Sequence, residues 1–136
     1  MAFPSKILLA QQKRGILILR ELKKLFPDAK IALTYKNHWE LLVAVILSEQ
    51  CTDKMVNRVT PPLFKKYPTL DDYLHADSKE FEKMVFKTGF YRNKTKNILA
   101  AARIIKEKFH GKIPRTMPEM LTIPGVARKT ANVVLG

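Results

Sequence analysis

The sequence predicts an all-α protein, and three of its features support that prediction. Apolar residues recur at helical spacing in nearly every segment, whereas no convincing stretch alternates apolar and polar residues as a half-buried strand would. Prolines, glycines and capping residues divide the chain into pieces of helical length. The run from Trp39 to Leu47 is apolar almost all round, which is typical of a central, fully buried helix.

The N-terminal half is expected to supply three helices. Residues 5–27 have apolar side chains at helical spacing and end at a proline. The second helix begins at Asn37, a plausible cap, and contains the buried run. A third begins at Asp53, its expected cap, and the pair Pro61–Pro62 should break or kink it.

The C-terminal half is expected to be helical as well. Two short amphipathic helices begin at Thr69 and Ser78 as caps, and Gly89 closes the second. Residues 116–136 predict a short helix, a tight turn and a second helix. Residues 93–111 predict a longer helix, whose apolar stripe lies opposite four basic residues: Lys94, Lys96, Arg103 and Lys106.

Length and composition restrict the class of protein. A chain of 136 residues can form one compact domain with a real core, and is too short for two ordinary ones. A single cysteine, Cys51, excludes an internal disulfide and a multi-cysteine metal site, and suits a reducing compartment. Neither a signal-peptide pattern nor an apolar stretch of membrane-spanning length is present in the sequence. We therefore expect a cytoplasmic protein with no membrane partner.

The net charge of +13 is concentrated at the two ends of the chain. Residues 1–36 hold eight Lys and Arg against two Asp and Glu, and residues 92–136 hold ten against two. The middle, residues 37–91, is balanced at seven against eight. Concentrated like charge costs self-repulsion on folding, so the pattern favours a polyanionic partner. Nucleic acid is the first hypothesis, with an acidic membrane surface or simple solubility as alternatives.

Two adjacent cations, Arg128 and Lys129, open the last predicted helix. Helix N-termini have partial positive charge, so local stability does not explain cations there. The preceding turn contains Pro124 and Gly125, and glycine lets the backbone come close to a ligand. Turn amides and a helix N-terminus together form an anion-binding nest, which suggests a contact with the phosphate backbone of DNA.

Three separated stretches resemble the endonuclease III family of DNA glycosylases, in the order in which that family has them. They are LLVAVILSEQCTDKMVNRVTPPLFKKYPT, KTGFYRNKTKNILAAA and LTIPGVARKTANVVLG, and the similarity covers about residues 26–136. The last stretch resembles the family's helix-hairpin-helix, except for Ala127, where a second glycine is more usual. Alanine would be strained there if the position needs a positive φ, and would fit if it only opens the helix.

The resemblance implies base-excision DNA repair: removal of oxidised pyrimidines from duplex DNA, followed by strand cleavage through β-elimination. Lys129 falls on the family's catalytic lysine, which forms a Schiff base with the sugar C1′ and needs an unprotonated amine to do so. Partial burial, the neighbouring Arg128 and the positive helix end would favour that neutral form. The alternative is that Lys129 only contacts phosphate or solvent. Adenine-mismatch glycosylases of the same superfamily usually lack this lysine, so the sequence favours the branch with lyase activity.

Further DNA contacts also follow from the resemblance. Gln50 and Phe90 fall on the residues that fill the gap left by a flipped-out base, although a helix-ending polar residue and a core aromatic are the alternatives. Arg92 and Lys94 are expected phosphate contacts, with a solvated basic face nearly as plausible. The hairpin contacts are expected from the turn and the start of the following helix: Pro124, Gly125, Val126, Ala127 and Arg128. Asp53 is expected to be a cap rather than a catalytic acid, Trp39 a core residue, and none of the three histidines has ligand or triad spacing.

Family members carry a catalytic aspartate shortly after the hairpin and four cysteines that hold a [4Fe–4S] cluster, and these 136 residues contain neither segment. We therefore expect a fragment of a longer enzyme, weak or inactive alone, with no metal site of its own. It would comprise the six-helix-barrel half of the glycosylase fold: an N-terminal helix at 1–25 and a helical domain at 26–136 that ends in the helix-hairpin-helix at 117–136.

The expected partner is double-stranded DNA with a damaged base or an abasic site, bound by a monomer at the nucleoid. Two alternatives stay open. One is a non-catalytic helix-hairpin-helix DNA-binding module or inactive fragment. The other is an RNA-binding or structural helical protein, for which Gln50 and Phe90 would have no use.

Overall fold

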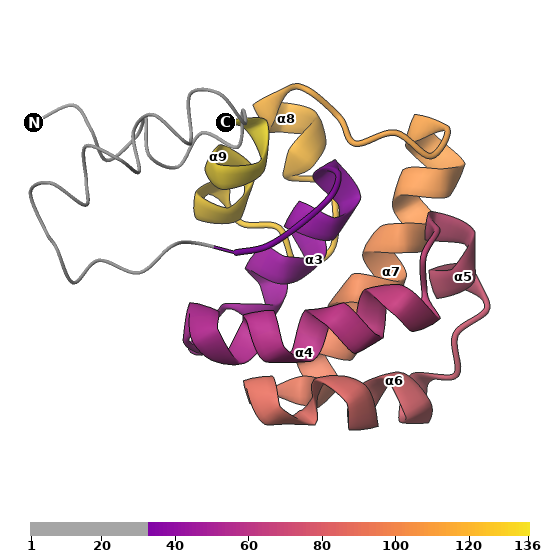
Figure 1. Cartoon of the computed structure of the whole chain (residues 1–136). Helices are drawn as coiled ribbons and strands as arrows, with labels where there is room; N and C mark the ends of the chain where they lie inside the picture. Colours follow the sequence, from indigo (N-terminus) through magenta and orange to yellow (C-terminus); the bar gives the residue numbers. More distant parts are fainter. Residues whose placement is uncertain (1–32) are drawn as a thin grey trace, which may run out of the picture.

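The computed structural model describes residues 33–136, and this part of the chain is entirely helical (Figure 1). The helix expected at 5–27 lies outside the described residues, as does the domain boundary at 25/26. The elements are α3 (His38–Leu47), α4 (Asp53–Lys66), α5 (Leu70–Leu74), α6 (Ser78–Val85), the 3₁₀ turn η1 (Phe86–Thr88), α7 (Tyr91–Phe109), α8 (Met117–Met120) and α9 (Arg128–Leu135). The prediction of an all-α fold is confirmed.

Helix α3 forms the centre of the domain, as its composition predicts. Every residue from Glu40 to Leu47 is buried, and α3 contacts α4, α7 and α9 (Figure 1). The one charged member of this run, Glu40, accepts a hydrogen bond from the backbone N–H of Lys36 at 2.9 Å, which offsets part of the cost of its burial. The cap at Asn37 is confirmed, since its side chain accepts from the N–H of Glu40.

A cluster of aromatic rings fills the space between α3, α4, α5 and α6. Tyr73 is almost completely buried and lies at its centre, 5.0 Å from Trp39 and 5.9 Å from Phe81 between ring centroids. Burial raises the pKa of the Tyr73 hydroxyl well above its ordinary value. Trp39 is thus a core residue, as expected, and the cluster joins the two short helices to the central one.

Three local expectations were wrong. The cap of α4 is Thr52 and that of α6 is Asp77, each one residue before the residue expected, because in both cases the earlier side chain accepts from an amide three positions on. Helix α4 also runs unbroken through Pro61–Pro62. Its buried face, which includes Val56, Val59 and Leu63, packs against the core on both sides of the prolines, and that packing offsets the lost backbone hydrogen bonds.

None of the helices described between residues 33 and 136 is both long and apolar enough to cross a membrane.

Candidate nucleic-acid interface

A pocket of about 490 Å³ gathers residues from three distant segments of the chain. The end of α3 supplies Glu49 and Gln50, the start of α7 supplies Phe90 and Asn93, and α9 supplies Lys129. Lys94 and Asn97 of α7 complete the lining. The structure thus brings together the predicted catalytic lysine and both predicted gap-filling residues, which the sequence separates by up to 79 positions.

The helix ends at this pocket differ from the other helix ends of the domain. Helices α3, α4, α5, α6 and α8 each begin with an Asn, Thr or Asp side chain that accepts from a first-turn amide. Helices α7 and α9 begin at Phe90 and Ala127, which provide no such acceptor, and neither helix has an acidic residue in its first turn. Both N-termini therefore keep free amides and uncompensated positive ends, which suit an anion.

The hairpin that precedes α9 depends on Gly125. Its φ is +81°, a conformation that L-residues with a side chain rarely adopt, and an added Cβ would lie 2.7 Å from the Cβ of Asn97. The turn is therefore pressed directly against α7. Ala127 has an extended backbone with φ −94°, so it opens the helix without strain and the departure from the family's usual glycine has no structural cost.

Gln50 and Phe90 project from the two turns at the mouth of the pocket. Both have left-handed backbones, with φ of 53° and 46°, and among the described non-glycine residues only His110 shares this feature. Phe90 is 63% exposed, so it is not the core aromatic that was its alternative. Gln50 is exposed and lies beyond the last residue of α3, free to contact a ligand. Exposed side chains on strained turns are typical of ligand contacts.

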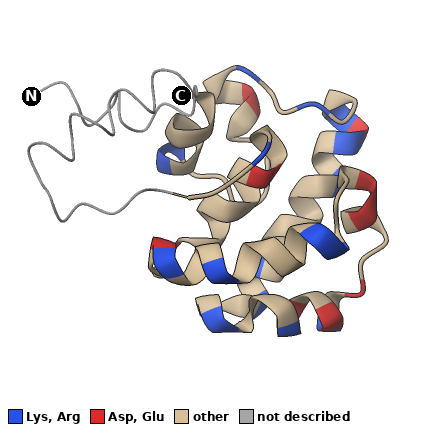
Figure 2. Cartoon of the chain, in the orientation of Figure 1, with Lys and Arg blue, Asp and Glu red and all other residues tan. Residues whose placement is uncertain are grey.

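The cations of α9 face solvent. Arg128 and Lys129 are both exposed in the described part of the chain, so the partial burial expected for Lys129 is wrong. Nothing in α8 or α9 covers this side chain, because its neighbours in the pocket lie on one side only. Arg92 is exposed as well, and its guanidinium lies 5.4 Å from the ring centroid of Tyr91. Figure 2 shows these basic stretches at the starts of α7 and α9, while acidic stretches gather on α5 and α6.

The prediction that Lys94 contacts phosphate needs correction. Lys94 is only 3% exposed, and its Nζ donates to the carbonyls of Leu47 and Thr88, at 2.8 Å each. It does not belong to the solvent-facing basic side of α7. Burial lowers its pKa, partly opposed by the nearby Cys51 and Glu49. Its two carbonyl partners direct this ammonium to the protein backbone rather than to a phosphate.

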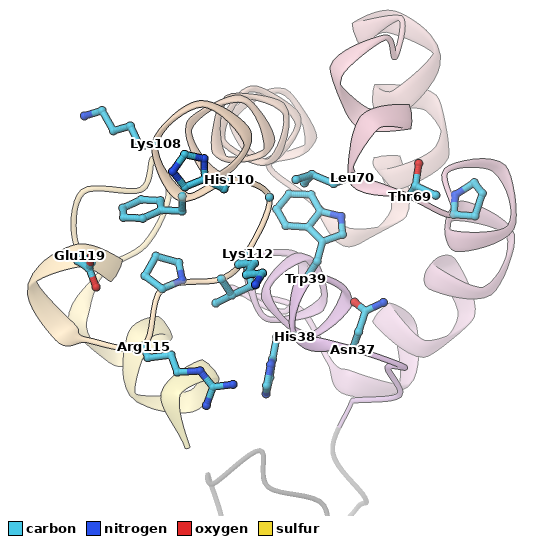
Figure 3. Close-up of a pocket in the computed structure, with 15 residues that line it drawn as sticks. Asn37, His38, Trp39, Thr69, Leu70, Lys108, His110, Lys112, Arg115 and Glu119 are labelled. Carbon is cyan, nitrogen blue, oxygen red and sulfur yellow. The ribbon is translucent and has the colours of Figure 1, made fainter.

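A larger cavity, of about 910 Å³, lies at the opposite ends of α3 and α7 (Figure 3). Trp39 at the start of α3 lines it, together with the segment that follows α7, residues 110–115. It has basic side chains of its own, but both helix ends there are closed: Asn37 caps α3, and the amide of His110 returns to the carbonyl of Ile105. This cavity lacks the free helix N-termini that distinguish the smaller pocket.

The residues of this chain do not fit an iron–sulfur cluster. Such clusters are held by several cysteine thiolates, and the sequence has only Cys51, which is half-buried at the end of α3. Between residues 33 and 136 there is no group of three or more His, Cys, Asp or Glu side chains that could hold a metal ion.

Sequence analysis missed three residues of the pocket: Glu49, Asn93 and Asn97. Their polar side chains at the ends of predicted helices were the available signal, but such residues usually cap or solvate a helix. Asn97 acquires its significance only through the tertiary contact with Gly125.

An all-helical domain with a basic, uncapped hairpin beside a pocket defines the class of helix-hairpin-helix DNA-binding proteins. The sequence itself agrees: residues 43–134 match the model of the HhH-GPD superfamily of base excision DNA repair proteins, and the chain belongs to that family.

Known proteins of this family are close in sequence and in structure. The chain is 52% identical to Endonuclease III of Synechocystis sp. over 126 residues, and 46% identical to Endonuclease III of Bacillus subtilis over 117 residues. These matches cover 93% and 86% of this chain, but 58% and 53% of the relatives. A non-covalent Endonuclease III–DNA complex and a trapped Endonuclease III–DNA covalent intermediate each superpose with a TM-score of 0.77 at 43% identity. They match over 93% of this chain and 59% and 60% of theirs, which confirms the expected glycosylase fold. The chain thus spans somewhat over half the length of the relatives it matches.

Proposed function

We propose that this chain is the DNA-gripping half of a bifunctional glycosylase that removes oxidised pyrimidines and then cleaves the abasic site through a Schiff base on Lys129. The observation that carries the proposal is the pocket in which this amine, Gln50 and Phe90 meet beside two uncapped helix N-termini. The similarity to two Endonuclease III–DNA structures supports it.

The first step is binding of the DNA backbone. The free amides at the start of α9, the turn at residues 124–127 and the side chain of Arg128 offer donors to successive phosphate oxygens. Arg92 adds a second exposed cation at the start of α7. None of these groups selects a base sequence, which suits an enzyme that must search any stretch of duplex.

The second step is extrusion of the target nucleotide. A base removed from the stack leaves a gap that must be filled, and the exposed ring of Phe90 can stack in it. The amide of Gln50 can donate to and accept from the orphaned base opposite. Both side chains lie at the rim of the pocket that would receive the nucleotide.

The third step is chemistry at the sugar. At an abasic site, the Lys129 amine would attack the C1′ aldehyde, form the C–N bond and lose water to give an imine. Its exposed position beside the pocket leaves it accessible to the extruded sugar. The only carboxylate among the pocket residues is Glu49, and no step is assigned to it. Such an enzyme would act in the cytoplasm, on the DNA of the nucleoid.

Borohydride trapping on a duplex with one abasic site tests this function. We expect the full-length gene product to form a covalent complex, and Lys129→Gln to abolish that complex while binding to undamaged duplex changes less than about threefold, about 0.6 kcal/mol. We expect the 136-residue chain alone to trap poorly, and efficient trapping by it would contradict that expectation. If the full-length protein binds DNA but never forms the complex, the alternative of a non-catalytic binding module is correct.

A further inference from the structure

The buried ammonium of Lys94 has no acidic partner among the ion pairs of the described residues. Burying a charge is costly unless hydrogen bonds compensate it, so its two carbonyl partners explain why it is stable there. One partner, Leu47, is the last residue of α3, and the other, Thr88, is the last residue of η1. These two residues are 41 positions apart in the sequence, so this one side chain connects the ends of two separate elements.

The Leu47 carbonyl has no other recorded donor in this region. The carbonyls of Ala44, Val45 and Ile46, which also end α3, accept from the amides of Ser48 and Glu49. Helix α3 has no basic residue in its own last turn. Lys94 therefore completes the C-terminal cap of α3 from another helix and places a positive charge at its negative end.

Both capped ends lead directly to the gap-filling residues. Gln50 lies three residues after Leu47, and Phe90 lies two residues after Thr88. Both have positive φ values, which persist only when the surroundings hold them in place. The backbone amide of Lys94 also donates to the carbonyl of Phe90, at 3.0 Å. One residue thus fixes both turns at the mouth of the pocket.

We propose that Lys94 is a positioning residue that locks the Gln50 and Phe90 turns into one rigid unit, so that both side chains enter the duplex at a fixed separation. This inference rests on the proposed function for its consequence, which is discrimination of an abasic or extruded site from intact duplex. It assigns Lys94 no contact with DNA. Because the hairpin and Arg128 grip the phosphates independently, loss of the lock should reduce discrimination and leave general DNA binding intact.

The test compares the affinity of the full-length protein for an abasic-site duplex with that for undamaged duplex. We expect Lys94→Met to reduce this preference at least tenfold and to change undamaged-duplex affinity less than threefold. Lys94→Arg, which keeps donors for the carbonyls, should restore most of the preference. Two controls separate other causes: Lys65→Met removes an exposed cation elsewhere, and Ile105→Ala destabilises the far end of α7 without touching either turn.

A double-mutant cycle then decides how Lys94 acts. In a Gln50→Ala/Phe90→Ala background, Lys94→Met should reduce the preference by less than a further twofold, because the residues it positions are gone. A full additional loss would overturn the inference by showing that Lys94 acts on DNA directly. An unchanged preference in Lys94→Met, or an equal loss in Ile105→Ala, would overturn it as well.

Hydrogen exchange gives a readout that does not depend on the proposed function. In free protein, Lys94→Met should speed amide exchange at residues 48–51 and 88–91 at least tenfold relative to the amides of α5 and α6. If wild type shows no preference for the abasic site, the proposed function fails, and this exchange pattern alone decides whether the lock exists. If Lys94→Met does not fold, Lys94→Gln replaces it in both measurements, and an unchanged exchange pattern there overturns the inference.

Discussion

Substitution of Gly125 by alanine tests the central structural claim about the hairpin. The residue has φ +81°, and an alanine Cβ would lie 2.7 Å from the Cβ of Asn97 on α7. Carbon atoms in contact are ordinarily about 3.5–4.0 Å apart, so either the turn or α7 must move. The hairpin amides would move with the turn, away from the phosphates they are proposed to bind.

The cost has two parts. A left-handed backbone costs an alanine roughly 1–2 kcal/mol relative to glycine. Overpacking against a helix adds roughly 1–3 kcal/mol, because the atom that is struck is the first side-chain carbon of Asn97 and cannot rotate away. We therefore expect a loss of roughly 2–5 kcal/mol in the free energy of unfolding.

Gly111→Ala is the matched control. Gly111 also has φ +81°, but its added Cβ would meet only a Leu70 side-chain carbon, at 3.9 Å, which is an ordinary contact. Denaturant unfolding at 25 °C, followed by circular dichroism, should give Gly125→Ala a loss greater than that of Gly111→Ala by roughly 1–3 kcal/mol. Equal losses in the two variants would show that the hairpin is not tightly packed on α7 and would refute the reasoning.

Further predictions concern single side chains. Asn37→Ala should cost about 1 kcal/mol in denaturant unfolding, because α3 loses its cap; no loss would contradict the cap. Arg128→Gln should reduce the slope of log affinity against log salt by about 1, since one phosphate contact is lost; an unchanged slope would exclude that contact. Phe90→Ala should weaken abasic-site binding about tenfold without destabilising the fold, and a large stability loss would show that its exposed ring packs on the protein. Burial lowers the pKa of Lys94, so between that value and 10.5 the unfolded chain binds more protons; wild type should gain stability relative to Lys94→Met as pH rises through this window, and a falling difference would contradict the sign.

Much of the fold could be predicted because it depends on local patterns. The apolar run in α3, the helical spacing in α7 and the turn at Pro124–Gly125 all predicted what the structure shows. Errors arose where neighbouring residues competed for one role. Thr52 and Asp53 can both cap a helix, and the backbone path that selects Thr52 is fixed by packing rather than by composition.

The residues of the site were predicted only through family resemblance, and their physical states differed from expectation in two cases. Lys129 was expected to be partly buried and is exposed, whereas Lys94 was expected on the surface and is buried. Periodicity places Lys94 on the first turn of a helix, but it does not show that two carbonyls from other elements converge there. Long-range convergence of this kind has no signature within a short window of sequence.

The sequence by itself determined the helical class, the buried central helix and the basic character of both chain ends, because these follow from side-chain polarity and local backbone preference. Only the tertiary structure decided that the ends of α3, η1 and α9 meet at one pocket, and that a buried ammonium holds two of them together. The physical reason is that packing joins segments through shape and unsatisfied hydrogen-bonding groups, and neither is expressed in the order of residues along the chain.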